Sequence, residues 1–298
     1  MIVVKLQGGL GNQMFQYALG RELQRRNENE LCLDLTWLLD RYPRSGVVFR
    51  NYELDIFAVR PRLTLLSHVA RRFSLPLVLM YGSQALREVK TKVGLMQYLA
   101  EAEMQSPLDV LEARGKLYLD GYWQSPKYFE GSEAILRREF KVRRPLSPAA
   151  EQIATRMAAT DSICVNVRRT DYVTLPASIE MHGFVGKEYY DRGIALITSQ
   201  LRNPHVFVTS DDIEWCRDNL RFDCPTTVLG HEYKGDRIGQ DLALMSCCKH
   251  FVIANSSFGW WSAWLSPNPE KIVVCPKDWF RKPLVGNPDM ILPGWIRL

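Results

Sequence analysis

The second half of this chain alternates short apolar strands with amphipathic helices, and this alternation constrains the fold more than any other feature. Strands are predicted at residues 163–167, 205–209, 226–229, 250–253 and 271–274. Helices are predicted among them at residues 187–201, 211–220, 237–246 and 258–265. Strands that alternate with helices form parallel sheets covered on both faces. The pattern therefore predicts an α/β fold whose ligands bind at the carboxyl ends of the strands.

The first half opens with the same order of elements. An apolar run is followed by a glycine-rich turn, a helix with apolar residues at every fourth position, and a second apolar run. Strands are expected at residues 2–6, 31–35 and 117–119, and a helix at residues 128–140. Residues 37–114 give no clear pattern. A basic stretch with two prolines at residues 141–150 predicts a boundary between domains 1–145 and 146–298, with Ser147 capping the next helix.

Length and composition are those of a globular protein. The chain has 298 residues, of which 46% are hydrophobic and 24% charged, so it can bury a core without a disulfide or metal. No run of 18 apolar residues occurs, and the N-terminus lacks the pattern of a signal peptide. The seven cysteines and five histidines show no metal-binding spacing. We therefore expect a cytoplasmic protein with reduced thiols and no metal cofactor.

Positive charge is concentrated in residues 41–92. The net charge of the chain is +5, whereas this region carries ten basic and three acidic residues. Apolar residues interrupt the basic ones, which argues against a nucleic-acid partner and favours an anionic surface or substrate. The region is a candidate for peripheral contact with the inner face of an anionic membrane.

A glycine-rich loop follows the first predicted strand, with the sequence Gly8-Gly9-Leu10-Gly11-Asn12-Gln13. Glycines before a helix let the backbone approach a ligand closely, and the helix N-terminus favours an anion. The spacing differs from that of dinucleotide and P-loop motifs, so NAD is not expected. The alternative interpretation is a tight turn with Asn12 as the helix N-cap.

Two arginines, Arg168 and Arg169, follow the predicted strand at residues 163–167. Arginine binds phosphate in bidentate fashion, so a diphosphate would suit this position. Asp171 could hold one of the guanidinium groups. The alternative is an arginine–aspartate network with a purely structural role.

Polar residues also follow two other strands. Asp211 and Asp212 could accept hydrogen bonds from a base or a ribose, or alternatively cap the next helix. Ser256 and Ser257 precede a helix whose free N–H groups would favour an anion. The tryptophans of that helix are expected in the core. Together, these strand ends suggest a site for a nucleotide diphosphate.

With these motifs assembled, the sequence resembles the bacterial inverting α1,2-fucosyltransferases. The stretches GGLGNQMFQYALG (8–20), VNVRRTDYV (165–173), SDDIEWC (210–216), NSSFGWWSAWL (255–265) and NPEKIVVCPKDWF (268–280) match the family's motifs in order. The resemblance implies two Rossmann-like domains facing across a cleft (GT-B type). It also implies GDP-fucose as the donor and, as the acceptor, a galactose of an oligosaccharide, including a lipid-linked one. The resemblance further implies a role in O-antigen polysaccharide biosynthesis.

The resemblance also implies roles for individual residues. Domain 1–145 would serve the acceptor and domain 146–298 would bind GDP-fucose. The implied catalytic residues are Arg168, Asn12 and Asp171, with Arg168 on the β-phosphate. The implied nucleotide-sugar contacts are Gly9, Gly11, Asn166, Arg168, Arg169, Asp211, Asp212, Ser256, Ser257 and Phe258. The general base stays unassigned, because Asp171 is expected to pair with an arginine.

One residue departs from the family pattern. The motif is His-x-Arg-Arg-x-Asp-Tyr, and this chain has Asn166 in place of the histidine. Asparagine can still exchange hydrogen bonds with guanine but cannot act as a base. One rival function is transfer of another GDP-sugar or formation of another linkage. The other is GDP-sugar binding without turnover, with activity lost through Asn166.

Overall fold

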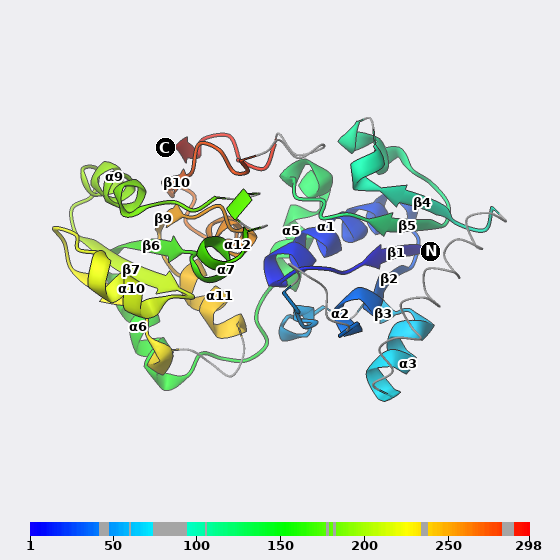
Figure 1. Ribbon diagram of the computed structural model, residues 1–298, viewed down its shortest axis with the longest axis horizontal. Coiled ribbons are helices and arrows are strands. Elements are labelled where there is room, and N and C mark those ends of the chain that lie inside the picture. The colour runs from blue at the N-terminus through cyan, green and yellow to red at the C-terminus, as the bar shows by residue number, and fades with distance from the viewer. Residues whose placement is uncertain are drawn as a thin grey trace. The chain divides into compact units, whose positions relative to one another are not determined.

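The computed structural model describes residues 1–41, 48–59, 61–73, 94–104, 106–176, 179–180, 183–233, 238–281 and 289–298. These residues form two compact units (Figure 1). The first contains Met1–Phe140 and a short C-terminal segment with Asp289 and Met290. An ion pair of 2.7 Å between Lys127 and Asp289 helps to hold that segment on the first unit. The second unit contains the described residues from Lys141 to Arg281, and Ile291–Leu298.

The first unit is built on a parallel sheet with the order β3-β2-β1-β5-β4 among the described residues. Its strands are β1 (Ile2–Lys5), β2 (Leu31–Asp34), β3 (Arg62–Leu63), β4 (Gln97–Ala100) and β5 (Leu117–Asp120). Its α-helices are α1 (Leu10–Asn27), α2 (Thr36–Leu39), α3 (Leu65–Phe73) and α5 (Glu133–Glu139). Its 3₁₀ turns are η1 (Leu54–Ile56), η2 (Glu101–Glu103), η3 (Pro107–Glu112) and η4 (Pro126–Ser132).

Helix α1 lies close against the sheet because Gly20 faces it. A Cβ at Gly20 would stand 2.7 Å from a methyl carbon of Val4 and 2.8 Å from one of Leu31, closer than such contacts allow. The apolar periodicity of α1 thus fixes its buried face, and the glycine sets its distance from β1 and β2.

The prediction of one continuous helix at residues 128–140 is wrong. The chain forms the 3₁₀ turn η4 and then α5, with non-helical backbone at Phe129 (φ −141°). Phe129 is fully buried, and its ring centroid lies 6.2 Å from that of Phe15 on α1. Packing of this ring in the core therefore outweighs local helix propensity.

The second unit has a parallel sheet with the order β11-β10-β9-β6-β7-β8 among the described residues. Its strands are β6 (Asp161–Val167), β7 (Pro204–Ser210), β8 (Thr226–Val228), β9 (His250–Ile253), β10 (Val273–Cys275) and β11 (Ile296–Arg297). Its helices are α6 (Pro148–Ala159), α7 (Thr170–Thr174), α9 (Lys187–Thr198), α10 (Ile213–Asn219), η5 (His231–Tyr233), α11 (Gly239–Ser246) and α12 (Ser257–Leu265).

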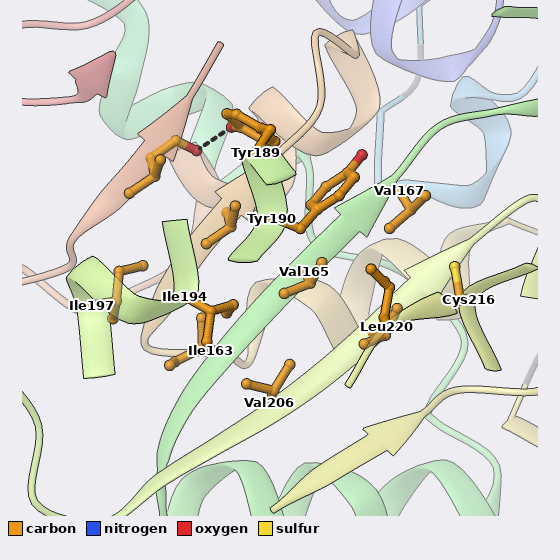
Figure 2. Close-up of a cluster of buried hydrophobic side chains, with 13 residues drawn as sticks. Ile163, Val165, Val167, Tyr189, Tyr190, Ile194, Ile197, Val206, Cys216 and Leu220 are labelled. Atoms are coloured by element: carbon orange, nitrogen blue, oxygen red, sulfur yellow. Dashed lines mark hydrogen bonds between the residues drawn. The ribbon is translucent and has the colours of Figure 1, made fainter. Parts of the chain in front are cut away.

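Helices cover both faces of this second sheet. Figure 2 shows the cluster on one face, where Ile163, Val165 and Val167 of β6 meet side chains from α9 and α10. The hydroxyl of Tyr189 donates to the carbonyl oxygen of Val274 at 3.2 Å, the dashed line in Figure 2. It also lies 2.6 Å from the carbonyl oxygen of Ile253. Alternation along β6 turns Asn166 to the other face, beneath α12.

The α/β fold class with two Rossmann-like parallel sheets is confirmed. Ser147 caps α6 as expected, with its hydroxyl accepting from the N–H of Ala150 at 3.3 Å. The three tryptophans of α12 are buried as expected. The sequence pattern did not predict β3, β4, β11, α2, α3 or α7, which are short or lie in the region without a clear pattern. Residue 237, the expected start of α11, lies outside the described residues.

Candidate active site

Two arginines and two aspartates pair at the carboxyl edge of the second sheet. Arg168 follows β6, and its Nη1 lies 2.8 Å from Oδ2 of Asp211, which follows the neighbouring strand β7. Each side chain is about one-quarter exposed or less (24% and 20%). Partial burial weakens screening by solvent, so this pair is held more firmly than a surface ion pair.

Asp211 also fixes the backbone that leaves β6. Its carboxylate accepts hydrogen bonds from the N–H groups of Arg169 (2.9 Å) and Thr170 (3.2 Å), and from the Thr170 hydroxyl. One carboxylate therefore orients Arg168 and also accepts from the backbone N–H of Thr170, the first residue of α7.

Arg169 is held in a similar way by the next aspartate. Its Nε donates to Oδ2 of Asp212 at 3.2 Å, and its guanidinium lies 3.9 Å from the ring centroid of Trp215. The other oxygen of Asp212 caps α10 by accepting from the N–H of Trp215 at 3.2 Å. The alternative interpretations of an arginine–aspartate network and of a helix cap both describe this geometry. The structure shows Asp211 and Asp212 beside the arginines. The side chain of Asp171 lies outside the described residues, so its pairing with an arginine stays a prediction.

Tyr172 connects the arginine loop with the end of β9. Its ring lies 5.6 Å below the guanidinium carbon of Arg168, and its hydroxyl donates to the carbonyl oxygen of Asn255 at 3.1 Å. The Asn255 amide in turn donates to the carbonyl oxygen of Trp279 at 3.1 Å. The predicted residues after β6 and β9 are thus brought to one place.

The N-terminus of α12 lies at this same edge. Ser256 is the N-cap residue without a side-chain cap, Ser257 opens the helix, and Phe258 is half-buried. The first N–H groups of a helix have no partners within it, and they carry partial positive charge. Together with Arg168, they make this edge suitable for an anion.

Asn166 lies beneath the first turn of α12. It is 7% exposed, its amide nitrogen is 3.5 Å from the Thr209 hydroxyl, and a Cβ at Gly259 would stand 2.5 Å from its Oδ1. Among the described residues, Oδ1 accepts no hydrogen bond. A buried acceptor without a donor costs free energy unless a bound molecule supplies one.

Hydrogen bonds from the buried face of α1 hold the glycine loop of the first unit in place. Gly8 has φ +76°, and a Cβ there would lie 2.4 Å from Nδ2 of Asn12, so only glycine fits. Gln13 is fully buried and donates to the carbonyl oxygens of Gly8 (2.9 Å) and Asn51 (2.8 Å). The alternative that Asn12 caps the helix is wrong, because α1 begins at Leu10 after Gly9. Gly11 is buried in its first turn.

Several supporting residues were missed by the sequence analysis. On the other side of the glycine loop, Oε1 of Gln16 accepts from the backbone N–H of Gln7 at 3.1 Å. The Gln16 amide nitrogen donates to the carbonyl oxygen of Gly121 at 3.1 Å. Gln124 donates to Oδ1 of Asn12 at 2.6 Å. Its neighbour Trp123 has φ +53°, a costly conformation for a bulky residue. The glutamines of the GGLGNQMFQ motif were the available signal, since polar residues on the buried face of a helix need partners.

Glu101 holds that strained segment in place. Its carboxylate accepts from the backbone N–H groups of Tyr122 (2.7 Å) and Trp123 (2.8 Å). Burial raises the pKa of Glu101, and these two donors oppose part of that rise. The Glu101 carboxylate thus helps to hold Trp123 in its positive-φ conformation after β5.

The site has neither a reactive thiol nor a metal cluster among the described residues. Burial raises the pKa of Cys216, near Asp212 and Arg169, to about 11, so its thiol is neutral and unreactive at physiological pH. No group of three or more His, Cys, Asp or Glu side chains comes together in the described ranges. The arginines and the N-terminus of α12 supply positive charge at this edge.

Two parallel-sheet units, with paired arginines at a strand end, form an architecture suited to an anionic ligand at the carboxyl edge of a sheet. The sequence profile described as "Glycosyl transferase family 11" matches residues 97–298. An α-1,2-colitosyltransferase of Escherichia coli is 29% identical over all of this chain and 99% of its own length. The O-antigen biosynthesis glycosyltransferase WbnK of Escherichia coli is 30% identical over 98% of this chain and 99% of its own length.

A solved structure is similar in fold. A variant of Arabidopsis thaliana FUT1, in complex with GDP, matches 97% of this chain and 74% of its own with a TM-score of 0.50 and 13% identity. The chain belongs to glycosyl transferase family 11, the α1,2-fucosyltransferase family. The resemblance found in the motifs is thereby confirmed. No helix within the described ranges has the length and apolar character required to cross a bilayer.

Proposed function

We propose that this enzyme transfers L-fucose from GDP-fucose to the 2-hydroxyl of a galactose in an oligosaccharide, with inversion. The observation that carries the proposal is the Arg168–Asp211 pair of 2.8 Å at the carboxyl edge of a parallel sheet, in a chain of family 11. An arginine held in one orientation is suited to a diphosphate, which it can meet with two parallel hydrogen bonds.

The proposed donor site lies on the second unit. Arg168 would contact the β-phosphate, and Arg169 would add positive charge beside it. Ser256, Ser257 and the first N–H groups of α12 would bind the other phosphate oxygens, with Phe258 adjacent. This assignment is supported by the link through Tyr172, which joins the arginine loop to the end of β9.

Guanine recognition is proposed for Asn166, with Asp211 and Asp212 as further contacts. The buried Oδ1 of Asn166 accepts no hydrogen bond from the described residues, and guanine offers N–H donors on its Watson–Crick edge. Because Asp211 and Asp212 already bind arginines, we expect Asn166 to make the larger contribution to base binding.

The proposed reaction is a single displacement. The 2-hydroxyl oxygen of galactose bonds to the anomeric carbon as the bond from that carbon to the diphosphate breaks, and the hydroxyl proton passes to a base. Negative charge then builds on the departing GDP, and Arg168 is placed to stabilise it. Asn12 and Asp171 are proposed as the other catalytic residues, and Gly9 and Gly11 as points where the backbone approaches the ligand.

One observation favours a second candidate donor, GDP-colitose. The colitosyltransferase relative is similar over its whole length, and colitose is fucose without its 3-hydroxyl. An enzyme that binds the fucose 3-hydroxyl with a buried polar group would reject colitose strongly, whereas an apolar wall would accept both. The test is turnover of GDP-fucose, GDP-colitose and GDP-mannose by the purified enzyme. The proposal requires GDP-fucose to be the best donor, and preference for either of the others would overturn it.

We also propose that the enzyme works at the cytoplasmic face of a membrane, where a lipid-linked acceptor would be found. On α3, Leu65 is 80% and Val69 36% exposed one turn apart, and the basic side chain of Arg71 is exposed nearby. Residues 42–47, 60 and 74–93 of the basic region lie outside the described residues. Exposed apolar residues near a basic side chain are typical of peripheral contact with anionic lipid, although the Arg71 guanidinium also lies 3.9 Å from Asp55. Sedimentation with phosphatidylglycerol vesicles tests it, with Leu65→Ser as the weakened variant.

A further inference from the structure

The strand order of each sheet indicates where a ligand binds. In an open parallel sheet, ligands bind at the carboxyl ends of the strands, at the point where the strand order reverses direction. In the second sheet this point lies between β6 and β9, the strands that Arg168 and Ser256 follow. In the first sheet it lies between β1 and β5, because β2 and β3 lie on one side of β1, and β5 and β4 on the other. The same rule therefore places a ligand of the first unit at the ends of β1 and β5.

Two loops leave these strands and are joined to each other. The glycine loop follows β1, and residues 121–124 follow β5. The Gln124 amide donates to Oδ1 of Asn12 at 2.6 Å and so connects the two loops. Trp123, next to Gln124, has φ +53°, and backbone strain of this kind is concentrated at ligand sites. The joined loops thus provide a fixed surface at the place that the strand order indicates.

Three carboxylates end or directly follow strands of the first sheet among the described residues, and two of them are fully engaged. The two oxygens of Asp34, at the end of β2, accept from the Thr36 N–H (2.9 Å) and the Tyr118 hydroxyl (2.7 Å). The two oxygens of Asp120, at the end of β5, accept from Nζ of Lys5 at 2.9 and 3.0 Å. These two carboxylates are therefore poorly placed to take a proton from a ligand.

The third carboxylate, that of Glu101 directly after β4, is engaged through one oxygen. Its Oε2 accepts from the backbone N–H groups of Tyr122 (2.7 Å) and Trp123 (2.8 Å), whereas Oε1 accepts no hydrogen bond from the described residues. A Cβ at Gly121 would lie 2.8 Å from Oε2, so the glycine lets the carboxylate lie against the loop. Glu101 is half-buried and Tyr122 is 44% exposed, so solvent reaches the loop here. One oxygen thus anchors the carboxylate, and the other can meet a ligand.

The surroundings of Glu101 suit a proton acceptor. Burial raises the pKa of Glu101, and the two backbone donors oppose part of that rise. Burial also raises the pKa values of the neighbouring Tyr122 and Tyr128 hydroxyls, so both stay neutral. Asp120 also acts on Tyr122, but it is paired with Lys5 at 2.9 Å. A carboxylate whose pKa is raised toward the working pH is a more effective base than one in water.

We propose that Glu101 is the general base of the transfer reaction and that its Oε1 takes the proton of the acceptor hydroxyl. The oxygen of that hydroxyl bonds to the anomeric carbon, the bond from this carbon to the diphosphate oxygen breaks with its electron pair going to GDP, and the proton moves to Glu101. The carboxylic acid then gives the proton to water. The inference rests on the proposed function for the reaction, and it assigns the base that the motifs left open.

Glu101→Gln tests the role, with Glu103→Gln as the matched control. Glutamine keeps a carbonyl oxygen that can accept from the Tyr122 and Trp123 N–H groups, but it cannot act as a base. It should lower kcat by about 10²-fold or more, with the donor KM and the GDP affinity by calorimetry close to those of the wild type. Glu103 is an exposed carboxylate in the same turn η2, so Glu103→Gln should keep wild-type kinetics. A Glu101→Gln enzyme whose kcat is within about threefold of the wild type would overturn the inference.

The pH dependence separates a base from a residue that only positions the loop. Wild-type kcat should fall as the pH falls through the pKa of Glu101, because the protonated acid cannot accept a second proton. This acid limb should be absent from the residual activity of Glu101→Gln and present in Glu103→Gln, with the melting temperature at each pH as the check on folding.

An acid limb that persists in Glu101→Gln would overturn the inference, and so would a folded wild type whose kcat stays constant down to about pH 4. The second outcome decides the matter even where Glu101→Gln does not fold. If the wild type neither binds GDP nor transfers fucose to any galactoside, it is the proposed function that fails.

Discussion

The guanidinium of Arg168 lies 2.8 Å from a carboxylate oxygen of Asp211, across the ends of the neighbouring strands β6 and β7. Asp211 also accepts from the two backbone N–H groups that follow Arg168 in the loop. The same carboxylate thus sets the direction of the side chain and the course of its loop. Preorganisation of this kind lets an arginine stabilise a leaving diphosphate without reorganising during the reaction.

Arg168→Ala should lower kcat by about 10²-fold or more, because it removes one preorganised partner of the leaving group. Arg168→Lys should also be severely impaired, since an ammonium cannot replace the planar fork. Steady-state kinetics with GDP-fucose, with circular dichroism as the check on folding, measures this. A variant that keeps more than about a tenth of the wild-type rate would exclude the role.

Asp211→Asn provides the matched test of positioning. It should lower kcat less than Arg168→Ala does, and the double variant should be no worse than Arg168→Ala alone, because both changes affect one unit. Asp218→Asn, an exposed position on α10, is the control and should behave like the wild type. Fully additive losses would show that Asp211 acts independently of Arg168.

Asn166→Ala should raise the donor KM more than it lowers kcat, because base contacts are the same in the ground and transition states. Steady-state kinetics at saturating acceptor measures both constants. A fall in kcat with an unchanged donor KM would instead place Asn166 in the chemical step.

Gly259→Ala tests the surroundings of Asn166. The new Cβ would lie 2.5 Å from Oδ1 of Asn166, so the variant should lower the melting temperature and weaken GDP binding. Gly259→Ala combined with Asn166→Ala should recover the melting temperature, because the clashing atom is gone. No recovery would mean that the backbone of α12, and not Asn166, requires the glycine.

The sequence allowed prediction of most strands and of the residues at their ends, because buried parallel strands are continuous apolar runs with ligand-facing polar residues after them. Arg168, Asp211 and Ser256 were all found in this way. The partners were not predictable: that Asp211 holds Arg168 depends on the pairing of β6 with β7, which periodicity does not reveal. The broken helix at Phe129 was missed because core packing outweighed propensity.

The stability of the first unit should depend on pH through Glu22. This carboxylate is 1% exposed and lies 2.7 Å from both Arg25 and Arg26, and it accepts from the Ser132 hydroxyl. Burial alone would raise the pKa of Glu22, but hydrogen bonds from Arg25, Ser132 and Arg26 outweigh it and lower the pKa to about 2. Its stabilising contribution is therefore full above its unfolded value, 4.5, and lost as the pH falls toward 2.

Denaturant unfolding at several pH values measures this dependence. Over that range Glu22 should account for about 3 kcal/mol of unfolding free energy. Glu22→Gln should be less stable than the wild type at pH 7 and should show a flatter profile between pH 4.5 and pH 2. An unchanged slope in Glu22→Gln would show that other carboxylates cause the acid dependence.

Activity should be the same in EDTA as in added Mg²⁺ or Mn²⁺. Arg168 and Arg169 supply positive charge at the proposed diphosphate site, and Asp211 and Asp212 are already bound to them and so are poorly placed to chelate a cation. Initial rates after dialysis against chelator measure this. Loss of activity that one specific divalent ion restores would contradict the proposed donor site.

The most direct test of the proposed function is product analysis after incubation of the enzyme with GDP-fucose and a panel of β-galactosides. The account predicts release of GDP and a product whose NMR spectrum shows an α-linked fucose on the 2-hydroxyl of galactose. A product with another linkage or a β-configured fucose, or tight GDP binding without transfer to any galactoside, would contradict it.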